Sequence, residues 1–327
     1  MRDSNKPAIE VTALAKRFGD VQAVCGAGFS VNSGEIFGFL GPNGAGKTTT
    51  IKMLTGLARP MGGRIAFFGQ DYTARIKKAQ HLMGVVADES NLYPEMSGFE
   101  NLCFCASLYG IDRRERERRA KRLLEQFGLS QAARRTFGAY SRGMKRRLTI
   151  AAGLIHQPKI LFLDEPTSGI DVANARQIRS HIASLKESGT TVFLTTHYIE
   201  EAERLCDRIA FIVEGKIVHT DTTENLLRQT QDKHILELAL TRPLEQLPRG
   251  IEQLLPSVTF SLASPTRLHA ITKSAQPLAP LISALEEGGI AVTEARALRP
   301  SLEDVFVRIT GIKAQNLTSA KQGKGKQ

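Results

Sequence analysis

The residues whose chemistry is clearest lie between positions 41 and 48 and read GPNGAGKT. Glycines at this spacing let successive backbone N–H groups point at phosphate oxygens with no side chain in the way. The apolar run EIFGFL precedes this stretch and the run KTTTIKMLTGL follows it, so a helix N-terminus should face the same anion. Lys47 is placed to reach the β- and γ-phosphates, and the Thr48 hydroxyl to bind Mg²⁺. The stretch therefore predicts a phosphate-binding loop for a nucleoside triphosphate.

A second stretch, KILFLDEPTSGID, could supply hydrolysis. It is an apolar strand that ends in Asp164, which would hold magnesium through water, and Glu165 follows as a candidate general base for the attacking water. Adjacent carboxylates at the carboxyl end of a strand lie where α/β sheets bind ligands. A strand that merely ends in an acidic turn is the structural alternative.

A third apolar strand, TVFLTT, ends directly before His197. A single histidine is usually a structural residue. Its position after a third strand of the same kind instead indicates contact with the γ-phosphate or the lytic water, provided that the first two sites are real.

The order of the elements predicts an α/β fold. Residues 8–31 alternate as short antiparallel strands, residues from 100 to about 154 are helical, and three apolar strands with helices between them follow. Such alternation is typical of a parallel sheet covered on both faces. We expect a first domain at 1–225, a small α+β domain at 226–312 whose first helix spans 244–255, and a disordered basic tail at 313–327.

The net charge of +11 is concentrated in one part of the chain. Residues 113–147 carry 13 Lys and Arg against three Glu, an excess of ten. Two interpretations stay open: a solvated helix face, or a docking surface for anionic lipid, an acidic partner or nucleic acid. The four cysteines lack zinc or disulfide spacing, the N-terminus has no signal-peptide pattern, and the apolar runs are too short to span a bilayer, so we expect a cytoplasmic protein.

With these motifs in order, residues 8–220 resemble the ABC-type ATPases, the nucleotide-binding subunits of ABC transporters. The resemblance implies a mixed-sheet core, an antiparallel β subdomain and a helical subdomain at about 98–155. It identifies ILFLDEP as the Walker B motif, SGID as the D-loop with Ser168 and Asp171 at a dimer interface, and His197 as the switch histidine. In this family the loop that binds ATP is Walker A, which here comprises Gly41, Pro42, Asn43, Gly44, Ala45, Gly46, Lys47, Thr48 and Thr49.

The resemblance also gives a purpose to YSRGM at 140–144, which corresponds to the family's signature motif LSGGQ. We call residues 141–143 the signature turn. In the family two ATPase domains stack head to tail, and the signature turn of each caps the ATP held by the other. Ser141, Arg142 and Gly143 would therefore contact ATP in trans, and the chain would form a homodimer or pair with a similar subunit.

The chain departs from the family pattern at four positions. Phe18 replaces the usual adenine-stacking tyrosine, Arg142 replaces the middle glycine of the signature, and Ile170 replaces a common leucine. The fourth is Asp88, which stands where the family has the Q-loop glutamine. We expect Asp88 to keep contact with the metal, together with Thr48 and Asp164, and to alter coupling to the transport partner.

The end of the chain narrows the expected function. RALRPSLEDVFVRITG, at 296–311, resembles the ending of ATPases from drug-resistance and polysaccharide-type exporters, including the daunorubicin-resistance and nodulation-factor exporter ATPases. This implies an ATPase subunit, with ATP and Mg²⁺, that is held at the inner face of the membrane by a separately encoded permease. The basic stretch would then meet anionic lipid. The alternatives are a soluble ABC ATPase acting on ribosomes or nucleic acid, which the lack of interleaved aromatic residues disfavours, and a regulator that does not hydrolyse ATP, which Glu165 and His197 disfavour.

Overall fold

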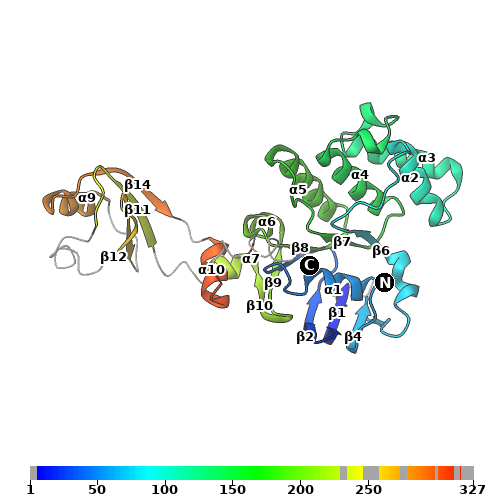
Figure 1. The fold of residues 1–327 in the computed structure, drawn as a ribbon, viewed down its shortest axis with the longest axis horizontal. Helices are drawn as coiled ribbons and strands as arrows, with labels where there is room; N and C mark the ends of the chain where they lie inside the picture. Colours follow the sequence, from blue (N-terminus) through cyan, green and yellow to red (C-terminus); the bar gives the residue numbers. More distant parts are fainter. Residues whose placement is uncertain are drawn as a thin grey trace. The chain divides into compact units, whose positions relative to one another are not determined.

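The computed structural model describes residues 6–228, 234–245, 258–272, 278–298, 301–312 and 317 (Figure 1). The first part of the chain contains these elements: β1 Ile9–Phe18, β2 Val21–Val31, β3 Ile36–Leu40, α1 Lys47–Leu54, β4 Gly62–Phe67, β5 Gln70–Asp71, η1 Ile76–Leu82, β6 Met83–Val86, α2 Gly98–Leu108, α3 Arg113–Gln126, η2 Ser130–Ala132, η3 Phe137–Ala139, α4 Arg142–Leu154, β7 Ile160–Asp164, α5 Val172–Glu187, β8 Thr191–Thr196, α6 Ile199–Leu205, β9 Arg208–Val213, β10 Lys216–Thr222 and α7 Thr223–Arg228. The later elements are β11 His234–Leu240, β12 Thr259–Ser264, β13 Arg267–Thr272, α9 Leu278–Glu287, β14 Val292–Leu298 and α10 Leu302–Thr310.

Internal contacts divide the chain into two compact units, residues 1–223 with 309–327, and residues 224–308. The first unit contains a six-stranded sheet in the order β10-β9-β3-β8-β7-β6. Strands β9, β3, β8, β7 and β6 are parallel, and β10 pairs antiparallel with β9, so the sheet is mixed. Because β3, β8 and β7 are neighbours, the three loops that carry the predicted chemistry leave the same edge of the sheet.

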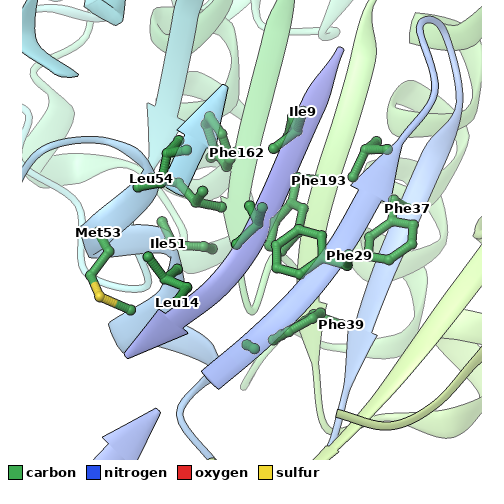
Figure 2. Close-up of a cluster of buried hydrophobic side chains, with 14 of the residues drawn as sticks. Ile9, Leu14, Phe29, Phe37, Phe39, Ile51, Met53, Leu54, Phe162 and Phe193 are labelled. Carbon is green, nitrogen blue, oxygen red and sulfur yellow. The ribbon is translucent and has the colours of Figure 1, made fainter. Parts of the chain in front are cut away.

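The expected antiparallel strands over 8–31 are confirmed as β1 and β2, which join β4 and β5 in a second sheet of order β2-β1-β4-β5. This sheet packs on the central one through aromatic side chains (Figure 2). The ring centroids of Phe29, Phe39 and Phe193 lie 5.4–5.7 Å apart, although the residues come from β2, β3 and β8. Ile51 and Leu54 of α1 belong to the same buried cluster, which therefore holds α1 and the phosphate loop before it against the sheet.

The helical region starts each of its three helices with a capping side chain. Ser97 and Glu100 form a reciprocal capping box at α2, Asp112 caps α3 and Ser141 caps α4. The basic stretch that includes α3 does not form one free surface. Glu115 pairs with both Arg118 and Arg119 on α3, and Arg146 on α4 is buried.

The second unit has a four-stranded sheet in the order β12-β13-β11-β14, with helix α9. Its own buried cluster includes Leu238, Phe260, Leu268 and Leu285. The strands and helices expected between 233 and 312 are present where the structure describes them. The helix expected at 244–255 lies almost entirely outside the described residues, as does most of the tail from 313. Among the described residues, no helix has both the length and the apolar character needed to cross a bilayer.

Candidate active site

A cavity of about 430 Å³ opens at the carboxyl edge of the central sheet. It is lined by residues from the phosphate loop, from β2 and from the loops after β6, β7 and β9: Val21, Gln22, Ala23, Asn43, Gly44, Gly46, Lys47, Thr48, Thr49, Asp88, Glu165 and Glu214. Sequence segments that lie far apart thus meet around one site, as the order of β3, β8 and β7 requires. Its size and the N–H groups at the start of α1 fit a nucleotide.

The phosphate loop depends on glycine at Gly46. Its φ is +101°, and a Cβ atom there would lie 2.3 Å from the carbonyl oxygen of Ala23 on β2. Lys47 is only 5% exposed, and its Nζ donates to the carbonyl oxygens of Gly41 at 2.7 Å and Pro42 at 3.1 Å. The lysine is therefore held along the loop, with its charge directed at the place where phosphates would bind.

Asp164 ends β7 and lies beside the start of α1. Its Oδ1 accepts hydrogen bonds from Thr48 Oγ1 at 3.1 Å and from Thr195 Oγ1 at 2.5 Å. The described residues contain no cluster of three or more His, Cys, Asp or Glu that would hold a metal alone. A hydroxyl and one or two carboxylates, completed by substrate phosphates and water, are nevertheless the oxygen ligands that Mg²⁺ prefers, so these residues fit the ion.

Glu165 lies between a lysine and a histidine. Its Oε1 is 3.2 Å from Lys47 Nζ, and its Oε2 is 2.7 Å from His197 Nδ1. Burial raises the pKa of Glu165, but the hydrogen bond from His197 and the charge of Lys47 outweigh it, so that the pKa falls below its usual value. The carboxylate is therefore ionised at neutral pH, which a general base requires.

The backbone at Glu165 is strained. Its φ is +49°, in the left-handed region that residues other than glycine rarely adopt. The Glu165 N–H donates to the carbonyl oxygen of Thr195 at 3.1 Å, and His197 N–H donates to Glu165 Oε2 at 3.3 Å. Strain of this kind persists only where neighbouring groups fix the conformation, and it is often found at active sites.

Asp88 and Phe18 occupy different positions relative to the cavity. Asp88 is exposed, follows β6 and lines the cavity. Phe18 is 51% exposed at the end of β1 and pairs in the sheet with Val21, which lines the cavity. Phe18 therefore lies at the margin of the site, about half exposed, and Lys16 Nζ lies over its ring at 5.0 Å from the centroid.

The signature turn lies outside this cavity. Within the described part of the chain, no residue that lines the cavity belongs to positions 141–143. Ser141 and Arg142 are exposed, whereas Gly143 is buried against Asn174. Arg142 lies over the D-loop of its own chain, because a Cβ atom at Gly169 would be 2.2 Å from its Nη2.

The D-loop residues Ser168 and Asp171 flank that contact. Ser168 N–H donates to the carbonyl oxygen of Glu165 at 3.2 Å, and Asp171 caps α5 by accepting from Asn174 N–H at 3.0 Å. Val172, directly after this cap, is 83% exposed. The signature turn and the D-loop thus form one surface of the chain with an exposed apolar residue beside it.

Two residues of the site were missed by sequence reasoning. Thr195, inside β8, donates to Asp164, and its backbone carbonyl fixes Glu165. Arg146, counted above only as part of the basic stretch, is buried and donates to the backbone of the Walker B segment. The only available signal for Thr195 was its place near the carboxyl end of a strand that precedes His197. Nothing in the local pattern distinguishes Arg146 from Arg147.

Comparisons with known proteins show which family the chain belongs to. The family model described as ABC transporter matches residues 25–168. Over 93% of the chain and 96% of the relative, the sequence is 37% identical to the daunorubicin resistance ATP-binding protein DrrA3 of Streptomyces coeruleorubidus. It is also 37% identical to the Nod factor export ATP-binding protein I of Ralstonia nicotianae, over 93% of the chain and 94% of the relative. A solved ATP-binding subunit of an ABC transporter superposes with a TM-score of 0.61 at 29% identity, covering 68% of this chain and 92% of that one.

The phosphate loop, the paired carboxylates and the histidine at one edge of a mixed sheet define a P-loop ATPase. The similarity to its relatives covers nearly their whole length and narrows this class to one family. The chain belongs to the ATP-binding proteins of ABC transporters, and it binds and hydrolyses ATP.

Proposed function

We propose that this chain is the ATPase subunit of an exporter, in which two copies close on two molecules of ATP and drive a separately encoded membrane permease. The export role rests on the names of its relatives, one a daunorubicin resistance protein and one a Nod factor export protein, which align over nearly their full length. The single observation that carries the mechanism is the position of Glu165, which is hydrogen-bonded to His197 and paired with Lys47 of the phosphate loop.

In the proposed reaction, each protomer supplies the groups around its own nucleotide. When ATP binds, Lys47 pairs with its phosphates instead of with Glu165, so Glu165 Oε1 can accept a proton from water. The water oxygen forms a bond to the γ-phosphorus, and the bond from that phosphorus to the bridging oxygen breaks to give ADP and phosphate. His197 orients Glu165 from the other side through the 2.7 Å contact.

Magnesium would be held by Thr48 and Asp164, which are hydrogen-bonded to each other, and by Asp88, which lines the same cavity as Thr48. When bound, the ion neutralises charge on the phosphate oxygens. Phe18, which is about half exposed beside the cavity, is the candidate for stacking on adenine.

The partner protomer would complete each site. Ser141 and Gly143 begin helix α4, so its N-terminal N–H groups and the serine hydroxyl can bind a γ-phosphate that another chain presents. Ser168, Asp171 and the exposed Val172 lie beside this turn and would pack across the same interface. No second copy is needed for nucleotide to enter the cavity, but one is needed to close it.

The decisive variant is Glu165→Gln. Loss of the base should slow ATP turnover by at least about 100-fold. ATP that is bound and not hydrolysed should then hold two chains together, as light scattering after gel filtration would detect. Glu214→Gln is the matched control, because Glu214 also lines the cavity but has no role in the proposed reaction. If the Glu165→Gln protein stays monomeric at saturating Mg-ATP, the proposed dimer is wrong.

The role in transport needs its own test. The chain should co-purify from membranes with a permease, and the permease should raise its ATPase rate. A chain that works only on ribosomes or nucleic acid would instead be found with those partners, and its ATPase rate would respond to them.

A further inference from the structure

Arg146 makes more hydrogen bonds to the active-site backbone than its place in a basic stretch suggests. It is 7% exposed on the inner face of α4. All five of its N–H donors are used, and every acceptor is a backbone carbonyl oxygen. Nε donates to Pro166 at 2.9 Å, Nη1 to Ala87 at 2.5 Å and Asp88 at 3.2 Å, and Nη2 to Asp164 at 2.6 Å and Glu165 at 3.1 Å.

These carbonyls belong to two separate stretches of chain that surround the cavity. One is the loop after β6, which carries Asp88, and the other is the end of β7 with the two residues after it. Burial disfavours the charge of Arg146, and the nearby carboxylates of Asp88 and Asp164 counteract this effect. A buried cation is tolerated only with such compensation, so its fork of donors holds the two stretches at a defined separation.

The contact with Glu165 bears on the strain described above. Nη2 donates to the carbonyl oxygens of both Asp164 and Glu165, which are the peptide groups on the two sides of the Glu165 Cα. Glu165 has its φ of +49° at this Cα. Arg146 therefore helps to fix the strained conformation that aims the carboxylate into the cavity.

The signature turn forms the start of the same helix, just before Arg146. Ser141 caps α4, and Gly143 precedes Arg146 by three residues, which is less than one helical turn. The turn has little room to move independently, because a Cβ atom at Gly143 would be 2.4 Å from Asn174 Cγ on α5. A shift of the turn is thus transmitted through rigid helix to the guanidinium group.

We propose that Arg146 is a positioning residue that couples the two ATP sites of the dimer. When the signature turn engages the nucleotide of the partner subunit, Arg146 aligns the carbonyls that orient Glu165 and Asp88 around the chain's own nucleotide. This inference rests on the proposed function, because the turn meets a phosphate only in the dimer. It predicts that hydrolysis at the two sites is cooperative, since each site then biases the other.

The test is Arg146→Lys, which keeps the charge but replaces a planar fork with one ammonium group that cannot serve both stretches. In ATPase assays over a range of ATP concentrations, the wild type should give a Hill coefficient above 1. In the variant the coefficient should fall toward 1 and kcat should fall about tenfold, within the range expected for a coupling residue. Binding of a fluorescent ATP analogue to the monomer should be unchanged, because Arg146 does not line the cavity.

Arg147→Lys is the matched control. It is the same substitution at the next position of the same helix, but Arg147 donates to the carbonyl oxygen of Phe127 in the helical region. It should keep the wild-type kcat and Hill coefficient. A purely structural role for Arg146 would lower the melting temperature and the amount of active protein while leaving the Hill coefficient unchanged, and that result overturns the inference.

Two further outcomes keep the inference separate from the proposed function. A wild-type Hill coefficient of 1 overturns the inference whatever the variants do, including the case in which Arg146→Lys does not fold. The Glu165→Gln dimer should still form when Arg146→Lys is added to it. If Glu165→Gln alone fails to dimerise, the proposed function fails; if it dimerises while Arg146→Lys retains full cooperativity, only the coupling role is lost.

Discussion

Glu165 carries its charge in a nearly closed site because two neighbours favour the ionised form. Lys47 contributes a positive charge at 3.2 Å and His197 a hydrogen bond at 2.7 Å, and together they outweigh the effect of burial. The carboxylate proposed as the general base is thus also part of what stabilises the nucleotide-free fold.

This arrangement predicts how stability depends on pH. A pKa that is lower in the folded protein means that Glu165 stabilises the fold above its unfolded pKa of about 4.3, and that this contribution is lost as the pH falls through the folded value. The difference in unfolding free energy between the wild type and Glu165→Gln should therefore be largest near pH 7 and shrink below about pH 4. Urea unfolding without nucleotide at pH 7, 5 and 3 measures it. A difference that does not change with pH contradicts the pKa assignment.

Asp88 gives a second prediction at the level of single residues. Asp88 lines the cavity, which is consistent with the expected contact with the metal. Asp88→Asn removes the charge with little change in shape, so the Mg²⁺ concentration for half-maximal ATPase activity should rise about tenfold. Glu89→Gln is the control, because Glu89 is adjacent and exposed but does not line the cavity. Equal Mg²⁺ dependence in both variants excludes a metal role for Asp88.

Among the elements, α4 connects two surfaces with different tasks. Its first residues form the signature turn, and Arg146 on the same helix reaches the backbone of the catalytic segment. The close fit of the turn against α5 means that even one added methyl group must displace it.

Gly143→Ala tests that fit. The new Cβ atom would overlap Asn174, so we expect a loss of about 1–3 kcal/mol in stability and at least about a tenfold loss in ATPase rate. ATP binding by the monomer should persist, because the signature turn does not line the cavity. The same substitution at Gly62, where a Cβ atom would meet nothing within 4 Å, should have little effect on either. Wild-type turnover in Gly143→Ala would show that the turn is not closely packed in the working enzyme.

At the scale of the whole molecule, the chain contains two units, each with its own buried cluster. Only the first contains the nucleotide cavity. Units with separate cores can unfold as separate cooperative transitions, and a ligand stabilises only the unit that binds it.

Calorimetry can test this division. A non-hydrolysable ATP analogue with Mg²⁺ should raise the melting temperature of one transition, by the equivalent of about 2.7 kcal/mol at a hundredfold excess over Kd, and leave the other unchanged. In a variant that cannot bind nucleotide, such as Lys47→Ala, neither transition should shift. If one transition moves as a whole, the two units unfold together.

Much of the fold and of the candidate site could be predicted from the sequence. The phosphate loop, the carboxylates after β7 and the histidine after β8 were all placed correctly relative to their strands, because glycine geometry and strand ends are local properties of the chain. The antiparallel strands, the helical region and the described elements of the second unit were predicted from the spacing of apolar residues, which is also a local property of the chain.

The tertiary structure alone decided which distant backbone groups meet. Arg146 and Arg147 have the same charge and similar sequence surroundings, yet one is buried against carbonyls up to 59 residues away and the other contacts the helical region. Likewise, Thr195 became an active-site residue only through the pairing of β7 with β8. Such roles depend on the convergence of loops from separate strands, and no local pattern of residue types encodes that convergence.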